Sequence, residues 1–266
     1  MYKALISDFD GTLASTDKSI CLKNIEAIRK MVERGYKFAL CTGRMTSSAL
    51  KVAGALPIKT LVGSFNGGEI TDTATGKSLY TKALSADECM PLIDFAIEKD
   101  VNCQIYSGNA IFPRKVTQYT DLYSRSCECS VCRTDDIRAE MERIGKTPKF
   151  LIIDERADEI FPEILKRFGG KYEIAHCHDG MIDFNPKGTN KGIVVDALCD
   201  IWGIDKKECI TIGDEGNDIP MLLNAGLGVA VANAADDVKA HAGYVTENSN
   251  DDGAVAETIN RFILGE

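Results

Sequence analysis

The sequence predicts an α/β fold in which a parallel sheet carries helices on both faces and an α+β domain is inserted into the chain. Short apolar runs alternate with amphipathic segments at both ends of the 266-residue chain, whereas the middle lacks this alternation. Buried parallel strands joined by helices have the first pattern. The composition is that of a globular protein, since 44% of the residues are hydrophobic and 27% are charged.

The first third of the chain predicts three strands of the parallel sheet. One apolar run ends at Ser7, and two others lie within the segments 37–44 (KFALCTGR) and 61–68 (LVGSFNGG). Between the first two runs, one face of a helix is marked by Ile25, Ile28 and Val32. These elements begin a Rossmann-like core.

The alternation stops after Gly68, and the next elements predict a different kind of domain. Residues 69–81 predict a hairpin that turns at Thr75-Gly76. Ser85-Ala86-Asp87-Glu88 is a capping box that starts a helix ending near Lys99. Strands and helices then follow in mixed order, with strands predicted at 101–107, 149–154 and 172–179 and a helix at 156–168, and the segment 181–186 closes this region.

The parallel pattern resumes at Asn190, where a helix is predicted to about Trp202. Three apolar runs follow, each with a helix after it: CITIGD, LGVAV and GYVT. We therefore expect a discontinuous core of residues 1–82 and 187–266 around an inserted domain of residues 83–186. An insertion at this place overhangs the carboxyl ends of the strands, where α/β sheets bind ligands.

Charge and the N-terminal segment limit the partners. The formal charge is −9, from 31 basic and 40 acidic residues, so we expect no nucleic-acid or membrane partner. The first residues lack the pattern of a secretion signal, and no run approaches the ~20 apolar residues of a membrane span. The ten cysteines follow no disulfide framework. We expect reduced cysteines and a cytoplasmic location, and the oligomeric state stays open.

A pair of acidic residues directly follows the first predicted strand, within the segment DFDGTL at residues 8–13. If Phe9 turns into the core, side-chain alternation places Asp8 and Asp10 on one side. Two carboxylates at so short a distance repel each other, so the pair needs a cation or a proton. Gly11 lets the backbone leave the strand sharply. The alternative is a plain strand-to-turn junction, because Asp and Gly are common turn residues.

Two further segments offer groups that suit an anion. Thr42 and Gly43 follow the second predicted strand, where a hydroxyl and backbone N–H groups near a helix start suit a phosphate oxygen. An ordinary Thr N-cap is the alternative. Lys191 starts the helix at which the core pattern resumes. The helix dipole disfavours a lysine there, so a fixed anion nearby would explain it, with Lys187 as the competing candidate.

The acidic loop 213–218 (GDEGND) follows the apolar strand CITI. Acidic side chains between glycines at a strand end pack poorly, but they supply oxygen ligands for Mg²⁺. The candidates are Asp214, Glu215 and Asp218, although Asp218 is also placed to cap the next helix. Because all these segments adjoin one sheet at the same edge, we expect their side chains to converge.

Together these motifs resemble the haloacid dehalogenase superfamily of phosphatases. The resemblance rests on the DxDGTL motif, the Thr after the second strand, the Lys at a helix start and the GDExND motif, and it covers both parts of the core. The inserted domain resembles the large type IIB cap of the Cof-like subfamily. The segment SFNGG resembles the NGA segment of that subfamily, with Gly68 in place of alanine.

The resemblance implies a Mg²⁺-dependent phosphatase that acts on small phosphorylated metabolites, such as sugar phosphates, through an aspartyl-phosphate. Asp8 would be the nucleophile and Asp10 the general acid and base. The phosphoryl group would be bound by Thr42, Gly43, Lys191 and Asn217. Mg²⁺ would be held by the Asp8 carboxylate, the Asp10 carbonyl and Asp214, with Glu215 or Asp218 in or near its shell. The leaving group would be contacted by Arg44, Asn66 and the cap.

Other interpretations stay open. A sugar phosphomutase would use the same chemistry, a phospho-accepting signalling domain combines similar residues in a shorter chain, and a catalytically silent sensor would keep the fold. In the inserted domain, Cys127, Cys129 and Cys132 could hold zinc with His176 or His178. Their spacing is irregular for structural zinc, so we expect packing or surface roles.

Overall fold

The computed structural model describes residues 1–178 and 180–266, apart from the side chains of Cys177 and His178. The predicted α/β class is confirmed. The chain forms two compact units, here called the core unit (residues 1–44, 49–80 and 190–266) and the inserted unit (residues 45–48 and 81–189). Their assignment as a catalytic core and a cap stays a prediction.

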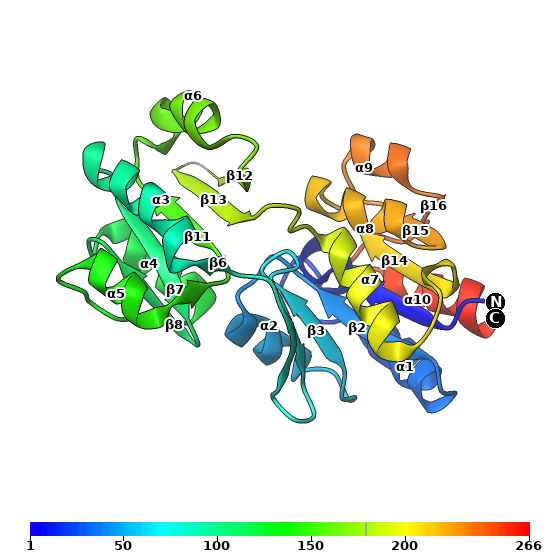
Figure 1. Ribbon diagram of the computed structural model, residues 1–266. Coiled ribbons are helices and arrows are strands. Elements are labelled where there is room, and N and C mark those ends of the chain that lie inside the picture. The colour runs from blue at the N-terminus through cyan, green and yellow to red at the C-terminus, as the bar shows by residue number, and fades with distance from the viewer. Residues whose placement is uncertain (179) are drawn as a thin grey trace. The chain divides into compact units, whose positions relative to one another are not determined.

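The core unit is built on an eight-stranded sheet with the strand order β16-β15-β14-β1-β2-β3-β4-β5 (Figure 1). Strands β16 to β3 in this order are parallel, and β4 returns antiparallel to β3. The strand bounds are β1 Ala4–Ser7, β2 Lys37–Cys41, β3 Leu61–Ser64, β4 Glu69–Asp72, β5 Ser78–Thr81, β14 Cys209–Gly213, β15 Leu227–Ala230 and β16 Tyr244–Val245.

The helix predicted from Asn190 to about Trp202 is present as α7, and five further helices of the described residues accompany the sheet. Together they are α1 Leu22–Glu33, α2 Thr46–Ala53, α7 Lys191–Trp202, α8 Ile219–Asn224, α9 Asp236–His241 and α10 Ala254–Ile259. Short helical turns also occur at η1 Phe9–Leu13, η2 Lys206–Glu208, η3 Gly216–Asp218 and η4 Asn260–Leu264.

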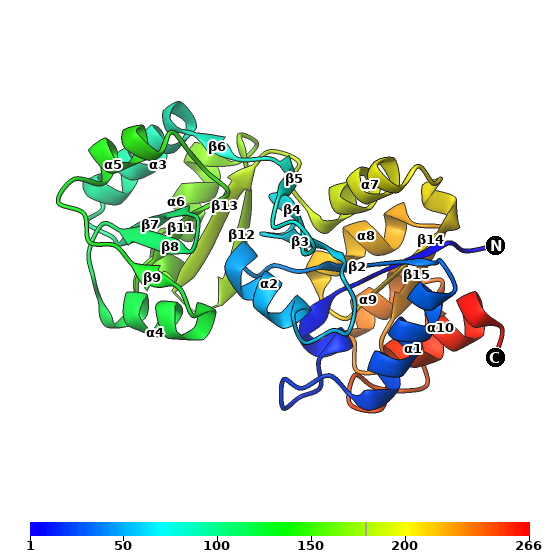
Figure 2. The same ribbon diagram turned by 90° about the horizontal axis from the view of Figure 1, so that it is seen from below.

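Helices cover both faces of the core sheet, as predicted. Leu5 and Leu40 pack in one apolar cluster with α1 and α10, whereas Ile6 and Ala39 pack in a second cluster with α7. Successive residues of a strand point to opposite faces, which explains this division. Figure 2 shows α1 and α10 on one side of the strands and α7 and α8 on the other. Burial on both faces accounts for the nearly continuous apolar runs.

The inserted unit contains a six-stranded, mainly antiparallel sheet with the order β12-β13-β11-β7-β8-β9. Its strands are β7 Cys103–Ser107, β8 Ala110–Pro113, β9 Ser130–Val131, β11 Phe150–Ile153, β12 Tyr172–His178 and β13 Met181–Pro186. A two-stranded sheet joins β6 Leu84–Ser85 to β10 Lys146–Thr147. The helices are α3 Ala86–Glu98, α4 Gln118–Cys127, α5 Ile137–Ile144 and α6 Ala157–Phe168.

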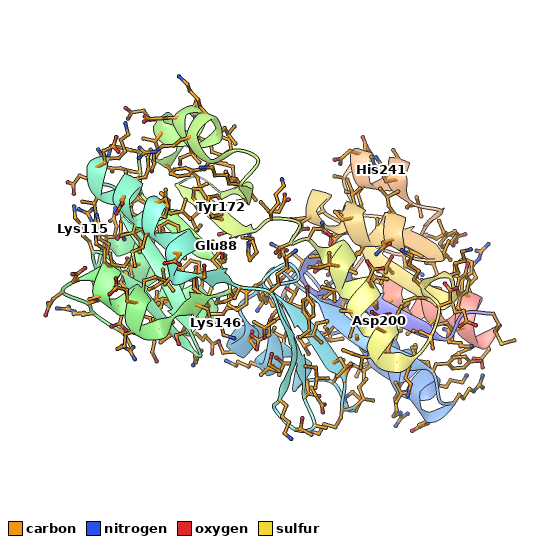
Figure 3. The ribbon with its side chains drawn as sticks, in the orientation of Figure 1. Glu88, Lys115, Lys146, Tyr172, Asp200 and His241 are labelled. Carbon is orange, nitrogen blue, oxygen red and sulfur yellow. The ribbon has the colours of Figure 1, made fainter. Side chains whose placement is uncertain are left out.

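One face of the inserted sheet packs on an apolar cluster with α3, α5 and α6. The predicted capping box is present: the Ser85 hydroxyl accepts from the Glu88 N–H, and the Glu88 carboxylate accepts from the Ser85 N–H. The Tyr172 hydroxyl of β12 donates to the Glu88 carbonyl of α3 at 2.7 Å (Figure 3). Within residues 1–178 and 180–266, every helix is too short or too polar to cross a membrane.

The parallel strands bring the predicted site segments to one edge of the core sheet. Strands β1, β2 and β14 end at Ser7, Cys41 and Gly213, and each is followed at once by a candidate residue. The Asp8 N–H still donates to Ile212, and the Thr42 N–H to Gly63, which extends the strand hydrogen bonding by one residue. Asp8 and Thr42 are therefore fixed by the sheet, whereas the Asp214 N–H donates to the Asp218 carboxylate.

Candidate active site

Residues 8–14, called the nucleophile loop for the predicted role of Asp8, leave β1 in an irregular conformation. Asp8 is extended, but Phe9–Leu13 forms a π-helical turn in which Asp10 and Gly11 depart from helical angles. Phe9 is buried, as expected, but the chain after Asp8 is an irregular turn and not a continuous extended strand. Gly11 has a φ of +72°, and a Cβ there would lie 2.2 Å from an oxygen of Asp214. Only glycine fits this approach of the loop to Asp214.

Lys191 is the buried cation of the site. Its Nζ donates to Asp8 Oδ1 at 2.7 Å and to Asp218 Oδ1 at 2.6 Å, and its side chain is only 2% exposed. Asn190 caps α7 and fixes the start of the helix. Although burial opposes the charged form, Asp8 and Asp218 raise the pKa of Lys191. The competing candidate, Lys187, instead pairs with Glu173 of the inserted unit.

Asp218 and Asp214 are held in the loop after β14. Asp218 Oδ2 accepts from the N–H groups of Asp214 and Glu215, both at 3.0 Å. Asp218 occupies the N-cap position of α8, as one alternative expected, but its side chain makes no capping hydrogen bond to that helix. Asp214 Oδ1 accepts from the Thr12 hydroxyl at 2.6 Å. The two acidic loops are thus bonded to each other.

The carboxylates of Asp8, Asp214 and Asp218 converge, with one oxygen from each lying within 4.8 Å of the others. Among the described residues, no other group of three or more acidic, His or Cys side chains lies close enough together to hold a metal ion. Burial raises the pKa of Asp8 well above 3.8, with Asp218 adding to the effect. Burial also raises the pKa of Asp214, to about 6. Three carboxylates around one ammonium leave excess negative charge, and oxygen ligands of this kind fit Mg²⁺.

The Asp10 carboxylate lies apart from this group and is bound by Arg44. Arg44 Nε and Nη2 each donate to one Asp10 oxygen at 2.7 Å, and Lys18 Nζ lies 3.3 Å from Asp10 Oδ1. The guanidinium also lies 5.0 Å from the ring centre of Phe9. Burial favours a higher pKa for Asp10, but Arg44 and Lys18 outweigh it and lower that pKa. Nothing in the sequence pattern had distinguished Lys18.

The remaining candidates lie around the ends of β2, β3 and β14. Thr42 is buried, and its hydroxyl accepts from the Arg44 N–H at 3.2 Å, but α2 begins only at Thr46, so Thr42 is not the N-cap of that helix. A Cβ at Gly43 would lie 3.0 Å from Asn66 Oδ1. Asn66 Oδ1 in turn accepts from Asn217 Nδ2 at 3.1 Å, which joins two predicted substrate-contacting residues. Glu215 and Asn217 are exposed. Their predicted roles toward phosphate, metal and leaving group stay predictions.

The cysteines of the inserted unit form no metal centre within the part of the chain that is described. Cys127, Cys129 and Cys132 are partly buried thiols. His176 contacts the Asp158 carboxylate through Nε2. The side chain of His178 lies outside the described residues.

Known proteins resemble the chain over almost its whole length. A family model described as haloacid dehalogenase-like hydrolase matches residues 5–259. The putative phosphatase YxeH of Bacillus subtilis (strain 168) is 26% identical over 100% of both chains. From the same organism, the 5-amino-6-(5-phospho-D-ribitylamino)uracil phosphatase YwtE is 27% identical over 99% of both chains.

A solved structure extends this likeness to three dimensions. The haloacid dehalogenase-like hydrolase from Bacteroides thetaiotaomicron has a TM-score of 0.87 and 28% identity, covering 99% of this chain and 100% of that one. The match of fold, of site motifs and of the family model over both parts of the core leads to one conclusion. The chain belongs to the family of haloacid dehalogenase-like hydrolases.

Proposed function

We propose that the protein is a Mg²⁺-dependent phosphatase of the cytoplasm that hydrolyses small phosphorylated metabolites through an aspartyl-phosphate on Asp8. The observation that carries the proposal is the buried group of Asp8, Asp214 and Asp218 around the Lys191 ammonium. The relatives named as phosphatases support the reaction class.

The charge of the cluster supports a divalent cation as cofactor. Asp8 and Asp214 both have raised pKa values, because burial and neighbouring carboxylates disfavour their ionised forms. A cation bound by Asp8, Asp214 and the Asp10 carbonyl, with Asp218 or Glu215 in or near its shell, would relieve this repulsion. When bound, Mg²⁺ supplies positive charge that reduces the repulsion between a carboxylate and a phosphate dianion.

Asp8 acts as the nucleophile in this proposal. One of its oxygens attacks phosphorus, the bond from phosphorus to the leaving oxygen breaks, and an aspartyl-phosphate forms. Lys191 holds the Asp8 carboxylate in place and offsets charge on the transferring group, together with Thr42, Gly43 and Asn217. Water then attacks phosphorus of the aspartyl-phosphate, which releases inorganic phosphate and restores Asp8.

Asp10 moves the proton in both steps. It donates a proton to the leaving oxygen and then takes one from the attacking water. The bidentate contact with Arg44 keeps the Asp10 carboxylate ionised, so protonation requires Asp10 to leave the guanidinium. Once released, Arg44 is available to contact an anionic or hydroxylated part of the substrate, with Asn66 beside Gly43.

The substrate class in this proposal is a small sugar or polyol phosphate. The relative YwtE is named for a ribityl phosphate, which is a polyol phosphate. A core-unit charge cluster of this kind recognises the phosphoryl group rather than the alcohol. The reaction class is therefore better supported than any particular leaving group.

The test is phosphate release from a panel of sugar and polyol phosphates, with Mg²⁺ and with EDTA. We expect Mg²⁺-dependent release from some members of the panel and none from Asp8→Asn. Release that persists in EDTA would contradict the metal assignment. Transfer of phosphate between sugar positions without release would indicate a mutase.

A further inference from the structure

The backbone of the nucleophile loop is held by side-chain amides from outside the four motifs. Within this irregular turn the Phe9 carbonyl accepts from the Ala14 N–H, and three further carbonyls of the loop accept from side chains. The Gly11 carbonyl accepts from Asn233 Nδ2 at 2.8 Å, and the Ala14 carbonyl accepts from Asn250 Nδ2 at 2.9 Å. Asn24 Nδ2 donates to the Leu13 carbonyl at 3.3 Å. Three asparagines thus hold three carbonyls of one short loop.

Each of two asparagines also accepts a bond at the other end of its amide. Asn233 Oδ1 accepts from the Asn250 N–H at 2.9 Å, and Asn24 Oδ1 accepts from the Ala256 N–H at 2.9 Å. An amide is the side chain that can donate and accept at once with this geometry. Aspartate would keep the accepted bond and turn the donated one into a contact between two oxygens.

Asn233 also belongs to the segment that holds the second acidic loop. In this segment, residues 231–235, the Val231 N–H donates to the Gly213 carbonyl at 3.1 Å. The Ala235 N–H donates to the Asp214 carbonyl at 3.2 Å. The segment therefore bonds to Gly11 on one side and to Asp214 on the other. Gly11 itself lies against the Asp214 carboxylate, where no Cβ would fit.

We propose that Asn233, supported by Asn250, is a positioning residue that fixes the spacing between the nucleophile loop and Asp214. This spacing sets how closely the Asp10 carbonyl, Asp8 and Asp214 can approach one divalent cation. That such a cation binds here is taken from the proposed function, on which this inference rests. The Asn233 side chain bonds to the Gly11 carbonyl and the Asn250 N–H, and not to the side chains that would hold the metal. Its effect is transmitted through the Gly11 carbonyl, next to Asp10.

The decisive variant is Asn233→Asp, which is isosteric. It keeps the acceptor for the Asn250 N–H and places an oxygen against the Gly11 carbonyl, so the loop must shift. Asn233→Ala removes both bonds without adding repulsion. Asn260→Ala is the matched control, because Asn260 lies in the same unit and its side chain makes no hydrogen bond to any described residue. Asn233 is exposed, so these variants are expected to fold.

The primary readout is Mg²⁺ binding by calorimetry on the full chain without substrate. We expect affinity about tenfold weaker in Asn233→Asp and about threefold weaker in Asn233→Ala, as for the loss of one backbone contact. Asn260→Ala should bind like the wild type. With a substrate, the turnover number should fall in Asn233→Asp and recover at high Mg²⁺, with KM for substrate unchanged. A purely structural defect would not be rescued by the ion.

Asp214→Asn separates this inference from the proposed function. If Asp214→Asn binds Mg²⁺ as tightly as the wild type, the metal assignment itself fails. If Asp214→Asn loses Mg²⁺ while Asn233→Asp keeps it, the positioning role of Asn233 is overturned. Should Asn233→Asp fail to fold, Asn250→Asp decides, because it reverses the Ala14 contact in the same manner. Unchanged Mg²⁺ affinity in a folded Asn250→Asp would then overturn the inference.

Discussion

Each unit of the molecule buries a lysine against carboxylates, and the two arrangements differ in their balance of charge. In the inserted unit, Lys149 pairs with Asp183 at 2.9 Å, and the side chains are 9% and 5% exposed. In the core unit, Lys191 bonds to Asp8 and Asp218, and Asp214 is close by. The first pair is one charge against one. The second has three carboxylates against one ammonium.

The difference indicates which buried charges serve structure and which serve chemistry. A balanced buried pair contributes little net stability, but removal of one partner is costly because the other is left uncompensated. An unbalanced cluster is costly even when intact, and it is relieved when a cation or a proton binds. The raised pKa values of Asp8 and Asp214 express that cost, since burial and mutual repulsion disfavour the ionised forms.

The largest expected effect is the loss of turnover in Asp8→Asn. The amide is a poor nucleophile, so we expect turnover to fall by roughly 10⁴-fold or more. The fold should persist, because Lys191 keeps its bond to Asp218 and one excess negative charge is removed. The measurement is phosphate release together with circular dichroism. Near-normal turnover in a folded variant would contradict the nucleophile assignment.

The two lysines should separate activity from stability. Lys191→Met should lower turnover by about 10³-fold, because positive charge beside the transferring phosphoryl group is lost. Lys149→Met should lower the free energy of unfolding by about 3–5 kcal/mol, because Asp183 is left buried and unpaired. Urea denaturation and phosphate release on both variants are the measurements.

A double variant supplies the control for this pair of lysines. Lys149→Met with Asp183→Leu should regain most of the lost stability, since an apolar pair of similar volume replaces the ions. Its turnover at saturating substrate should stay near the wild-type value. If the double variant lost turnover as severely as Lys191→Met, the division between structural and chemical lysines would be wrong.

The sequence was sufficient for the fold class and for the strand ends that carry the candidate residues. Apolar runs that end in acidic residues or Thr-Gly placed Asp8, Thr42 and Asp214 correctly after β1, β2 and β14. Parallel strands then required these loops to share an edge. The spacing of apolar residues is a local property of the sequence, and the shared edge follows from the strands being parallel. Both can therefore be predicted from residue patterns.

Contacts between distant loops could not be read in the same way. The bond from Arg44 to Asp10 depends on the irregular turn after Asp8, which alternation did not predict. Asn233 belongs to no motif, and its link to Gly11 joins residues 222 positions apart. The residue pattern alone left Lys187 beside Lys191, and only the resemblance chose Lys191; its bonds to Asp8 and Asp218 could not be read from the sequence. Such contacts are set by tertiary packing rather than by spacing.

A smaller effect, on stability, is expected from Asp214→Asn in the metal-free protein. Burial raises the pKa of Asp214 from 3.8 to about 6, so the folded state binds more protons than the unfolded state between these values. The free energy of unfolding therefore falls as pH rises through that window. The shift corresponds to about 3 kcal/mol at pH 7, and the amide removes this penalty.

Urea denaturation at several pH values tests this expectation in EDTA. The variant should be more stable than the wild type at pH 7.5, and the difference should vanish below about pH 4. Added Mg²⁺ should stabilise the wild type and leave the variant unchanged. With Mg²⁺ the wild type should therefore be the more stable of the two proteins. A variant that is less stable than the wild type in EDTA at pH 7.5 would show that the Asp214 carboxylate is not under strain in the empty cluster.

The smallest expected effect lies at the exposed edge of the site, where Lys18 contacts Asp10. The Lys18 side chain is 65% exposed, so its ion pair with Asp10 should contribute about 0.5 kcal/mol or less to stability. Lys18→Ala should also act on the pKa of Asp10. Arg44 and Lys18 both lower that pKa, so removing Lys18 should raise it slightly. In the proposed mechanism Asp10 is the base of the hydrolytic step and must be ionised, so the acidic limb of the pH–rate profile should move to higher pH. Arg44→Met should move that limb further, since Arg44 binds both Asp10 oxygens whereas Lys18 is screened by solvent and salt. An equal shift in the two variants would mean that exposed and half-buried cations act alike on Asp10, which the difference in their contacts argues against.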